Sequence, residues 1–248
     1  MQRGGTDLEP ARIAWEERAR ARALLREHPL VLVRAPGLAP RDLVSFACTL
    51  GDIEPVHRPL FRHEDDPRIM RRGNPRAADG TTIGANAVGH GFHSDMSFRP
   101  RPPRLTMLYA VETPRAGGAT EFGSLERLHG LLAEASWSDH AVRHETPSTA
   151  FRDDPDRASV KPLVAHHPDH GRPFVYASPC YAKEIVGIPA DVSADILARI
   201  AEACEPPDYA HAWQNGDLLL WDNLGVVHRA TPFDPNDHRL LWRMSVHL

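Results

Sequence analysis

The sequence predicts a mainly β fold, a jelly roll or similar double-sheet barrel with helices packed outside it. Short strand-like segments dominate the second half of the chain, and 17 glycines and 23 prolines separate them. With 248 residues, 42% of them hydrophobic, the chain can build one sizeable core, and no repeat or linker divides it. We therefore expect a single domain over residues 1–248, with a doubly wound α/β fold as the alternative.

The first fifty residues predict a helix, a strand and a second helix. Residues 8–28 place alanine and leucine at helical spacing among charged residues, which is typical of an amphipathic helix. The run HPLVLVRAPG (28–37) is typical of a strand. Residues 41–50 again carry apolar side chains at helical spacing, and Gly51 should end that helix.

Residues 52–104 predict a long loop region with short strands. The segment is rich in proline, glycine, arginine and aspartate and shows little hydrophobic periodicity. Because long loops within compact domains often bind ligands, we expect residues 52–92 to form a lid.

The rest of the chain alternates strand patterns with two helical ones. Strands are expected at 104–114, 117–122, 163–167, 173–178, 217–223, 225–231 and 240–248, and helices at 124–135 and 191–204. Many short strands separated by turns favour two packed sheets over a parallel one.

Charge and composition exclude several classes of protein. Lys and Arg total 29 against 33 Asp and Glu, so the chain lacks the basic excess of a nucleic-acid binder. No run approaches the ~20 apolar residues of a membrane span, and the N-terminal MQRGGTDLEP lacks the apolar core of a signal peptide. We expect a soluble, cytoplasmic protein with a small-molecule partner, no nucleic acid or membrane partner, and scope for a homo-oligomer. Three scattered cysteines, Cys48, Cys180 and Cys204, predict neither a disulfide framework nor a thiolate metal site.

The motif His93-Ser94-Asp95 is the first candidate for metal binding. Residues two apart on an extended segment point to the same side and can hold one metal ion together. The same spacing occurs at His63-Glu64-Asp65 and at His167-Pro168-Asp169, so spacing alone does not choose among the three. Context favours His93, because His63 lies in a charged run that predicts a solvated loop and His167 in a polar turn, whereas His93 lies beside apolar residues.

A third ligand is best supplied by His228, at the end of an apolar strand pair much later in the chain. Two histidines and one carboxylate form the facial triad of non-haem Fe(II) oxygenases, which leaves coordination positions open. A zinc hydrolase uses the same ligand types and stays open as an alternative. It would need a carboxylate base, for which the nearby candidates are Glu112 and Glu121.

Two arginines follow His228 on the last predicted strand. Arg239 and Arg243 have an even separation, which places them on one face of an extended strand. Arg243 lies between Trp242 and Met244, so an inward-facing anion site is a reasonable interpretation, with Thr120 as a hydroxyl donor.

In combination, these motifs resemble the taurine/dichlorophenoxyacetate dioxygenase family of Fe(II)- and 2-oxoglutarate-dependent oxygenases. H-x-D at 93–95, GGATEF at 117–122, HGRPFVYAS at 170–178 and GDLLLWDNLGVVHRA at 216–230 occur in the family's order. HPLVLVRAPG and FACTLGDIEP resemble its N-terminal segments, so the similarity covers roughly residues 20–248.

The resemblance implies a double-stranded β-helix and assigns roles by position. His93, Asp95 and His228 would hold Fe(II), and Thr120 and Arg239 would bind the distal carboxylate of 2-oxoglutarate. Arg243 would face an anionic end of the substrate, with Met96, Phe98 and His57 as pocket walls. O₂ would be consumed as 2-oxoglutarate is decarboxylated to succinate and CO₂ and the substrate is oxidised, most simply by hydroxylation.

Departures from the family pattern bear on the substrate. The family's His-Pro-Val-Tyr run reads Glu54-Pro55-Val56-His57 here, and Gly89 and Phe92 replace an asparagine and a tryptophan near the first ligand. Taurine is therefore disfavoured. HSDMSFRPRP resembles the aryloxyalkanoate-degrading branch, which favours an organic carboxylate.

Three alternatives stay open. Glu54 could pair with a substrate ammonium, which would suit an amino acid in a biosynthetic pathway. A sulfonate from a sulfur-scavenging pathway is the second. A catalytically inactive metal-binding jelly roll is the third.

Overall fold

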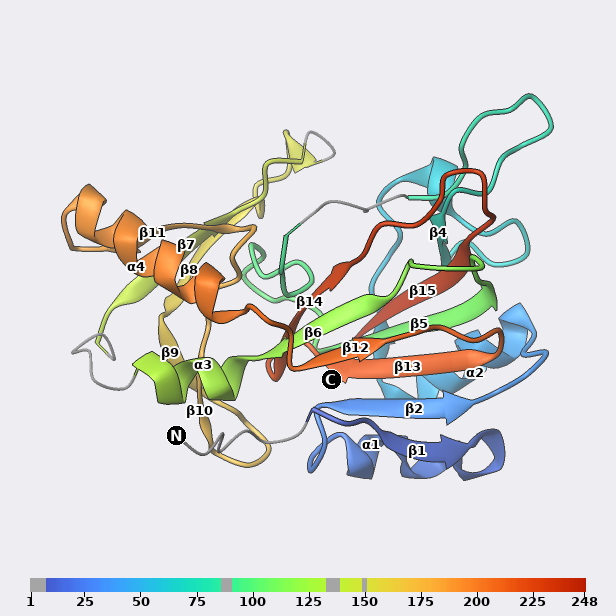
Figure 1. Ribbon diagram of the computed structural model, residues 1–248, viewed down its shortest axis with the longest axis horizontal. Helices are drawn as coiled ribbons and strands as arrows, with labels where there is room; N and C mark the ends of the chain where they lie inside the picture. Colours follow the sequence, from blue (N-terminus) through green and yellow to red (C-terminus); the bar gives the residue numbers. More distant parts are fainter. Residues whose placement is uncertain (1–7, 86–90, 133–138, 149–150) are drawn as a thin grey trace.

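The computed structural model describes residues 8–85, 91–132, 139–148 and 151–248 (Figure 1). In chain order the strands are β1 (Ala11–Ala14), β2 (Leu30–Arg34), β3 (Asp52–Ile53), β4 (Met70–Gly73), β5 (Leu105–Glu112), β6 (Thr120–Ser124), β7 (Ala141–Glu145), β8 (Ala158–Pro162), β9 (Val164–His166), β10 (Pro173–Val175), β11 (Ala182–Val186), β12 (Tyr209–His211), β13 (Asp217–Asp222), β14 (Val226–Ala230) and β15 (Leu240–His247). The α-helices are α1 (Ala21–Leu24), α2 (Pro40–Leu50), α3 (Leu125–Leu132) and α4 (Ala190–Ala203), and the 3₁₀ helices are η1 (Trp15–Arg20) and η2 (Pro59–Phe61).

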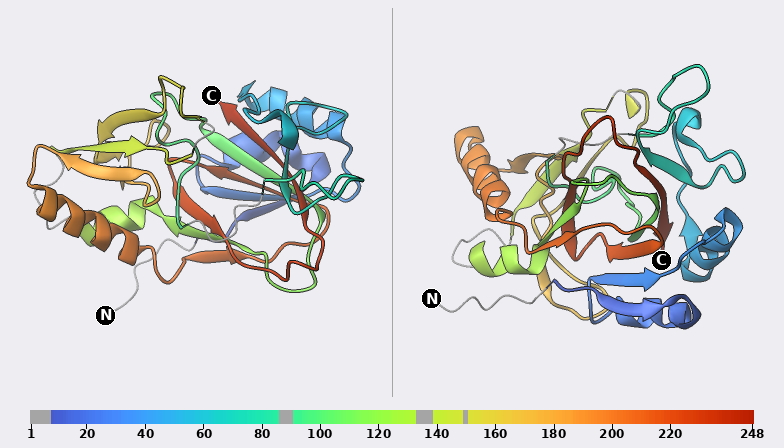
Figure 2. Two further views of the ribbon diagram at one scale, coloured as in Figure 1. Left: turned by 90° about the horizontal axis from the view of Figure 1, so that it is seen from above. Right: turned by 45° about the vertical axis from the view of Figure 1, so that its right-hand side comes forward.

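The architecture is a jelly-roll core of two facing sheets, as the sequence predicts. The larger sheet has the order β1-β2-β13-β5-β15-β3, with β4 also paired to β15, and the facing sheet has the order β12-β6-β14. Every pair in both sheets is antiparallel except β1 with β2. Figure 2 shows the two sheets curving around a common interior, with α2 outside the larger one.

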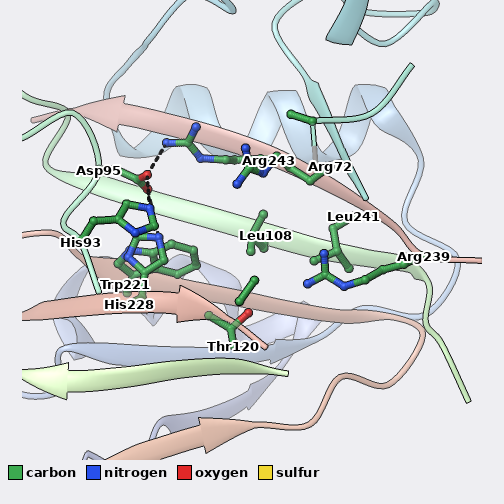
Figure 3. A pocket seen from close by; sticks show the side chains of 12 residues that line it. Arg72, His93, Asp95, Leu108, Thr120, Trp221, His228, Arg239, Leu241 and Arg243 are labelled. Carbon is green, nitrogen blue, oxygen red and sulfur yellow. Dashed lines mark ion pairs between the residues drawn. The ribbon is translucent and has the colours of Figure 1, made fainter. Parts of the chain in front are cut away.

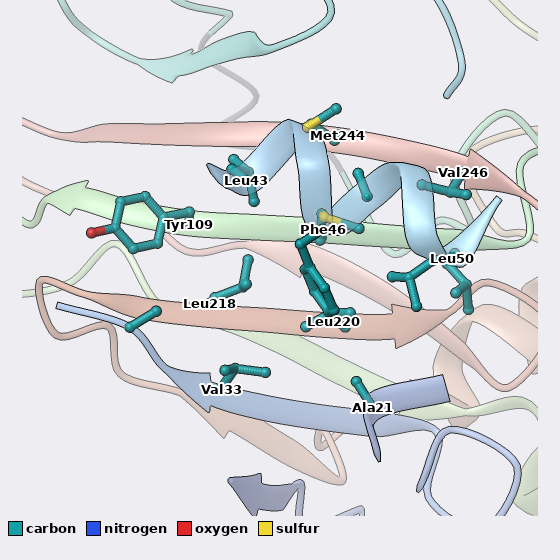
Figure 4. Packing of buried hydrophobic residues seen from close by; sticks show 14 of the residues in the cluster. Ala21, Val33, Leu43, Phe46, Leu50, Tyr109, Leu218, Leu220, Met244 and Val246 are labelled. Atoms are coloured by element: carbon teal, nitrogen blue, oxygen red, sulfur yellow. The ribbon is translucent and has the colours of Figure 1, made fainter. Parts of the chain in front are cut away.

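Alternation along the central strands separates two hydrophobic clusters. Leu218 and Leu220 of β13 point outward to Phe46 and the rest of the apolar face of α2 (Figure 4), whereas Leu219 and Trp221 point inward to the facing sheet. Successive side chains of a strand point to opposite faces, so a run of apolar residues can serve both layers at once. This explains why the motif DLLLW is apolar throughout.

A third cluster lies to one side of the sandwich, beneath α3 and α4. These helices pack over the small sheets β11-β7-β8 and β9-β10, with Leu125, Leu128, Ile196 and Ile200 buried among the strand residues. The strands β7, β8, β11 and β12 were not among the elements that the sequence pattern predicts. They are short and partly exposed, so their periodicity is weak.

The N-terminal prediction is wrong in part. Residues 8–28 do not form one helix, because Ala11–Ala14 pairs in parallel with Val31–Arg34 as strand β1, and only η1 and α1 follow as short helices. The edge of β2 offers unpaired backbone groups that outweigh the local helical preference of alanine and arginine.

Gly51 ends α2 as predicted, but for a different reason. Its φ of 165° is extended, so no left-handed cap is involved. A Cβ at this position would lie 2.0 Å from the carbonyl oxygen of His247, so the chain needs glycine to pass close to β15.

The region 52–104 is largely loop, with β3, η2 and β4 as its short elements before β5 begins, and part of the expected lid, residues 86–90, lies outside the described residues. The three cysteines are free thiols. Within the described ranges, no helix combines the length and apolar character that a bilayer crossing needs.

Candidate active site

A cavity lies between the two sheets and encloses ≈ 460 Å³, part of it open to solvent. β5, β13 and β15 of the larger sheet, β6 and β14 of the facing sheet, and β4 all contribute to its walls (Figure 3). Its lining residues are Arg72, Ala85, His93, Asp95, Leu108, Thr120, Trp221, His228, Ala230, Arg239, Leu241 and Arg243. Six of the nine predicted site residues lie here: the three metal-ligand candidates, Thr120, Arg239 and Arg243.

His93, Asp95 and His228 converge at one end of this cavity. One nitrogen or carboxylate oxygen from each lies within 4.8 Å of the others. Nε2 of His93 is 3.9 Å from Asp95 Oδ1, and Nε2 of His228 is 3.7 Å from Asp95 Oδ2. These separations are too long for hydrogen bonds, yet bonds of about 2.1 Å to a shared metal ion span them.

The backbone sets this geometry. His93 and His228 form an antiparallel bridge, in which each N–H donates to the other's carbonyl oxygen, at 3.0 and 2.8 Å. Asp95 follows in a turn that the Ser97 N–H closes on the Ser94 carbonyl, and in this turn Met96 has a left-handed φ of 51°. A non-glycine residue in this region is strained, which is common beside functional sites.

Asp95 is held as a charged carboxylate. Arg243 Nη2 lies 3.0 Å from its Oδ1, and the Thr106 hydroxyl donates to its Oδ2 at 2.7 Å. Asn223 Nδ2 in turn donates to the Thr106 oxygen at 3.0 Å. Burial alone would raise the pKa of Asp95, but the positive charge of Arg243 and the hydrogen bond from Thr106 oppose burial and hold the pKa well below its usual range.

Both histidines are held in the neutral form, which is the form that ligates metals. Burial lowers the pKa of His93 and lowers that of His228 well below the usual value. Nδ1 of His93 faces the Gly91 carbonyl at 3.1 Å, which leaves Nε2 as its free ring nitrogen toward Asp95. Two neutral imidazoles and one carboxylate on one face fit a divalent iron ion.

Thr120 and Arg239 face each other at the opposite end of the cavity (Figure 3). Trp213 Nε1 donates to Thr120 Oγ1 at 3.0 Å, so the Thr120 hydroxyl proton is free to donate into the cavity. Arg239 is 5% exposed and its Nη2 donates to the Gly118 carbonyl at 3.2 Å. Its Nε has no partner within the described structure.

Gly118 explains part of the GGATEF motif. Its φ is +67°, and a Cβ there would lie 2.9 Å from Pro114 Cγ and 3.2 Å from Arg239 Nε. Glycine is therefore required both by the backbone conformation and by the close approach of the guanidinium.

Arg243 and Arg72 lie side by side on the wall nearest Asp95 (Figure 3). Arg243 points inward, as its spacing from Arg239 predicts, and it also donates to Ser245 Oγ at 3.0 Å. Arg72 was missed by the sequence analysis. It comes from β4, which pairs with β15, and nothing in the run MRRGN distinguishes it from Arg71.

The expected pocket walls Met96, Phe98 and His57 are not among the residues that line this cavity in the described structure. Phe98 is buried against Tyr181 and Phe151, with ring centroids 5.2 Å away in both cases. The Tyr181 ring in turn lies edge-on to His93 at a centroid distance of 5.9 Å, so Phe98 packs behind a ring that contacts this ligand candidate. Any role of these three residues in substrate binding stays a prediction.

Glu54 and His57 bond to each other. Glu54 Oε1 is 2.8 Å from His57 Nε2, and Oε2 is 2.6 Å from His247 Nε2. Burial raises the pKa of Glu54, but the two histidines outweigh this effect and lower it. Phe92 is buried, and Gly89 lies outside the described residues.

Both of the other H-x-D histidines are buried, although His167 does lie in the polar turn between two strands, β9 and β10, that the sequence predicts. His63 is buried with its ring edge-on to Trp242, so the solvated-loop interpretation is wrong. His167 is also buried. It belongs to a second cluster of possible metal ligands with Asp169 and Asp222, but Arg104 bonds to all three at 2.6–3.0 Å. A guanidinium there satisfies both carboxylates, which indicates a structural ion-pair network.

Two histidines and one carboxylate that could form a facial triad lie inside a jelly roll with a basic pocket beside them, and this combination indicates the class of protein, a non-haem Fe(II) dioxygenase. The sequence model for "Taurine catabolism dioxygenase TauD, TfdA family" matches residues 5–245. The chain belongs to the TauD/TfdA family, and it is an Fe(II)- and 2-oxoglutarate-dependent dioxygenase that uses O₂.

Three relatives illustrate the similarity. Pentalenolactone F synthase of Streptomyces arenae is 35% identical over 227 residues, which cover 81% of this chain and 76% of the relative. The alpha-ketoglutarate-dependent 2,4-dichlorophenoxyacetate dioxygenase of Burkholderia sp. (strain RASC) is 31% identical over 242 residues, 87% of this chain and 80% of the relative. The crystal structure of a taurine dioxygenase from Burkholderia xenovorans matches with a TM-score of 0.78 and 25% identity, covering 98% of this chain and 83% of that one.

Proposed function

We propose that this dioxygenase hydroxylates a small organic substrate that carries a carboxylate, coupled to decarboxylation of 2-oxoglutarate to succinate and CO₂. The observation that carries the proposal is the charge of the cavity, in which three guanidinium groups face one carboxylate beside the histidine pair. The carboxylates of 2-oxoglutarate neutralise only part of this positive charge, so some of it is left for a second anion.

The residues divide into three groups. His93, Asp95 and His228 are proposed to hold Fe(II). Thr120 and Arg239 are proposed to bind the distal carboxylate of 2-oxoglutarate, since both donate into the end of the cavity away from the triad. Arg243, on the wall of Asp95, is proposed to face the anionic end of the substrate.

Bound iron and 2-oxoglutarate would supply the chemistry that oxidises a C–H bond. The protein positions the substrate and excludes water from the site. Leu108, Leu241 and Trp221 line the cavity and exclude water along its walls. Arg243 and Thr106 hold the Asp95 carboxylate in one orientation. Trp213 turns the Thr120 hydroxyl into a donor toward the cavity.

Two observations support a carboxylate over the amino-acid and sulfonate alternatives. Each oxygen of Glu54 already bonds to a histidine, so this carboxylate is not free to pair with a substrate ammonium. The relatives include a 2,4-dichlorophenoxyacetate dioxygenase and an (S)-phenoxypropionate dioxygenase, both named for carboxylates.

The metal-hydrolase alternative lacks its base. Glu121 bonds to Arg229 at 2.6 Å, and neither Glu121 nor Glu112 lines the cavity within the described structure. A cytoplasmic location, homo-oligomerisation, the single-domain boundary and lid closure by residues 52–92 stay predictions.

The test is succinate formation from 2-oxoglutarate with Fe(II) and ascorbate, in air and anaerobically. A panel of aryloxyalkanoates, other carboxylates, sulfonates and amino acids serves as substrates. Oxygen-dependent succinate stimulated by a carboxylate supports the proposal, and stimulation by sulfonates or amino acids alone refutes the substrate class. Absence of Fe(II) and 2-oxoglutarate binding would indicate a catalytically inactive protein.

A further inference from the structure

We infer that Arg72 is a second anion-binding residue of the substrate pocket, which receives the substrate carboxylate directly. The inference rests on the proposed function and deepens it, because it assigns the carboxylate to a residue that the motifs of the sequence do not mark.

The position of Arg72 depends on how β4 pairs. Arg72 lies opposite Leu241 of β15, and its side chain runs into the cavity beside Arg243 (Figure 3). Its neighbour Arg71 points the other way and is paired with Glu64, at 2.9 Å. One strand therefore directs one arginine toward Glu64 and the next one into the pocket.

Arg72 differs from the other cavity arginines in its partners. Arg243 is engaged by Asp95 and Ser245, and Arg239 by the Gly118 carbonyl. Within the described ranges, the Arg72 guanidinium forms neither a hydrogen bond nor an ion pair. A guanidinium carries five N–H donors, and those of Arg72 have no acceptor among the described residues.

An unpaired cation in such a place is costly unless an anion joins it. Burial, together with neighbouring Arg243, lowers the pKa of Arg72 to about 10, so the group stays charged at neutral pH. A carboxylate can accept two parallel hydrogen bonds from a guanidinium, which matches the free fork of Arg72.

The net charge of the pocket with iron and 2-oxoglutarate bound also favours an anionic substrate. Three guanidinium groups and the Asp95 carboxylate leave two positive charges in the cavity. Ferrous iron adds two more, and the 2-oxoglutarate dianion removes two. The cofactor-loaded pocket therefore keeps an excess of positive charge on the wall of Arg72 and Arg243, and an anionic substrate neutralises it.

The experiment uses full-length protein loaded with Mn(II) and N-oxalylglycine, so that the cosubstrate position is filled and no turnover occurs. Isothermal titration then measures binding of acetate, benzoate and phenoxyacetate, each compared with its uncharged amide. The variants are Arg72→Gln, Arg72→Lys and, as a matched control from the same strand, Arg71→Gln. Thermal unfolding of each variant reports whether it folds.

Wild type should bind at least one of these carboxylates about tenfold more tightly than its amide. Arg72→Gln should weaken that carboxylate about 10- to 100-fold, because a charge-assisted hydrogen-bond pair is lost. Arg72→Lys should recover part of the loss, and Arg71→Gln should change it by less than about twofold. The affinity for N-oxalylglycine should change little in all three variants.

Several results would overturn the inference. They are equal carboxylate affinity in Arg72→Gln and wild type, equal affinity of wild type for acid and amide, or no carboxylate binding to wild type up to about 50 mM. A large loss of N-oxalylglycine affinity in Arg72→Gln with unchanged carboxylate binding would instead assign Arg72 to the cosubstrate. Failure of wild type to bind Mn(II) and N-oxalylglycine would refute the proposed function separately, and repeating the titration on metal-free protein would still test Arg72.

Discussion

The main chains of His93 and His228 hydrogen-bond to each other in both directions, at 3.0 and 2.8 Å. This bridge brings the two imidazole rings to a centroid separation of 4.4 Å, although the residues come from distant parts of the chain. Asp95 lies two residues after His93, at the start of the turn that Ser97 N closes on the Ser94 carbonyl, and its carboxylate reaches the same point. Backbone pairing therefore places the two histidines, and the turn that follows His93 places the carboxylate.

His93→Ala and Asp95→Ala should each abolish Fe(II)-dependent turnover of 2-oxoglutarate, by more than about 100-fold, because loss of an outer-shell partner alone costs 10- to 100-fold. Succinate formation and Fe(II) binding are the measurements. His28→Ala, at an exposed position, is the control and should retain wild-type turnover. His63→Ala should keep turnover largely intact but lower stability, since His63 is buried. Retained activity in the His93 and Asp95 variants would refute the ligand assignment.

Arg239→Ala should raise the KM for 2-oxoglutarate with a smaller effect on kcat. The lost charge-assisted hydrogen bond is worth about 1.5–3 kcal/mol, which corresponds to a 10- to 150-fold weaker cosubstrate. Initial rates at varied 2-oxoglutarate measure the effect. Arg115→Ala is a suitable control, because Arg115 is exposed and its ion pair with Asp237 lies at the surface. An unchanged KM would remove Arg239 from the cosubstrate site.

Gly118→Ala should impair cosubstrate binding without touching a charged group. The new methyl would lie 3.2 Å from Arg239 Nε and 2.9 Å from Pro114 Cγ, so the guanidinium must move. We expect the KM for 2-oxoglutarate to rise about tenfold. Gly171→Ala is a matched control, because Gly171 has a similar φ of +72° but no heavy atom within 4 Å of the new Cβ. Both should lose about 1–2 kcal/mol of stability, and only Gly118→Ala should alter KM.

Arg104→Gln should destabilise the fold by about 3 kcal/mol, because it leaves the Asp222 carboxylate buried without its cation. Chemical denaturation measures the loss. Arg68→Gln, which removes the exposed pair with Asp66, should cost less than about 1 kcal/mol. Similar losses in the two variants would contradict the structural role of Arg104.

The lowered pKa of Asp222 also predicts that the protein loses stability in acid. Burial raises its pKa, but His167 and Arg104 outweigh burial, so the folded-state pKa lies below the ordinary value of about 3.9. The resulting stabilisation is fully present above that value and is lost as the pH falls through the folded-state pKa. Unfolding free energies between about pH 5 and pH 2 should fall in wild type, and less steeply in Asp222→Asn.

Much of the site could be predicted from the sequence because its residues sit on regular strands. The even spacing of Arg239 and Arg243 predicts that both point to one side, and the structure confirms that Arg239, just before β15, and Arg243, within it, both line the cavity. The short separation in the H-x-D motif also keeps its two side chains together, although Asp95 lies in a turn and not on a strand. Such local periodicity needs no knowledge of distant partners.

Other features depended on contacts that periodicity does not encode. Residues 11–14 form a strand only because the edge of β2 lies beside them. Short strands such as β7 and β8 are likewise defined by their hydrogen bonds to each other and not by a periodicity of their own. His63 and His167 appear in polar runs yet are buried, because residues distant in sequence pack over them. Arg104 lies in the loop before β5 and Asp222 ends β13, so these two ion-pair partners meet only in the folded protein.

The sequence by itself predicted the class of fold and the residues that line the cavity as metal-ligand candidates, and the family resemblance of its motifs supplied the proposed cosubstrate role of Thr120 and Arg239. Only the tertiary structure decided which charged side chains have an ion-pair partner and which have none. Arg71 and Arg72 are indistinguishable in the sequence, and the pairing of β4 with β15 turns one outward to Glu64 and the other into the pocket. Whether a charge is paired depends on the distance to groups far along the chain, and that distance is set by packing.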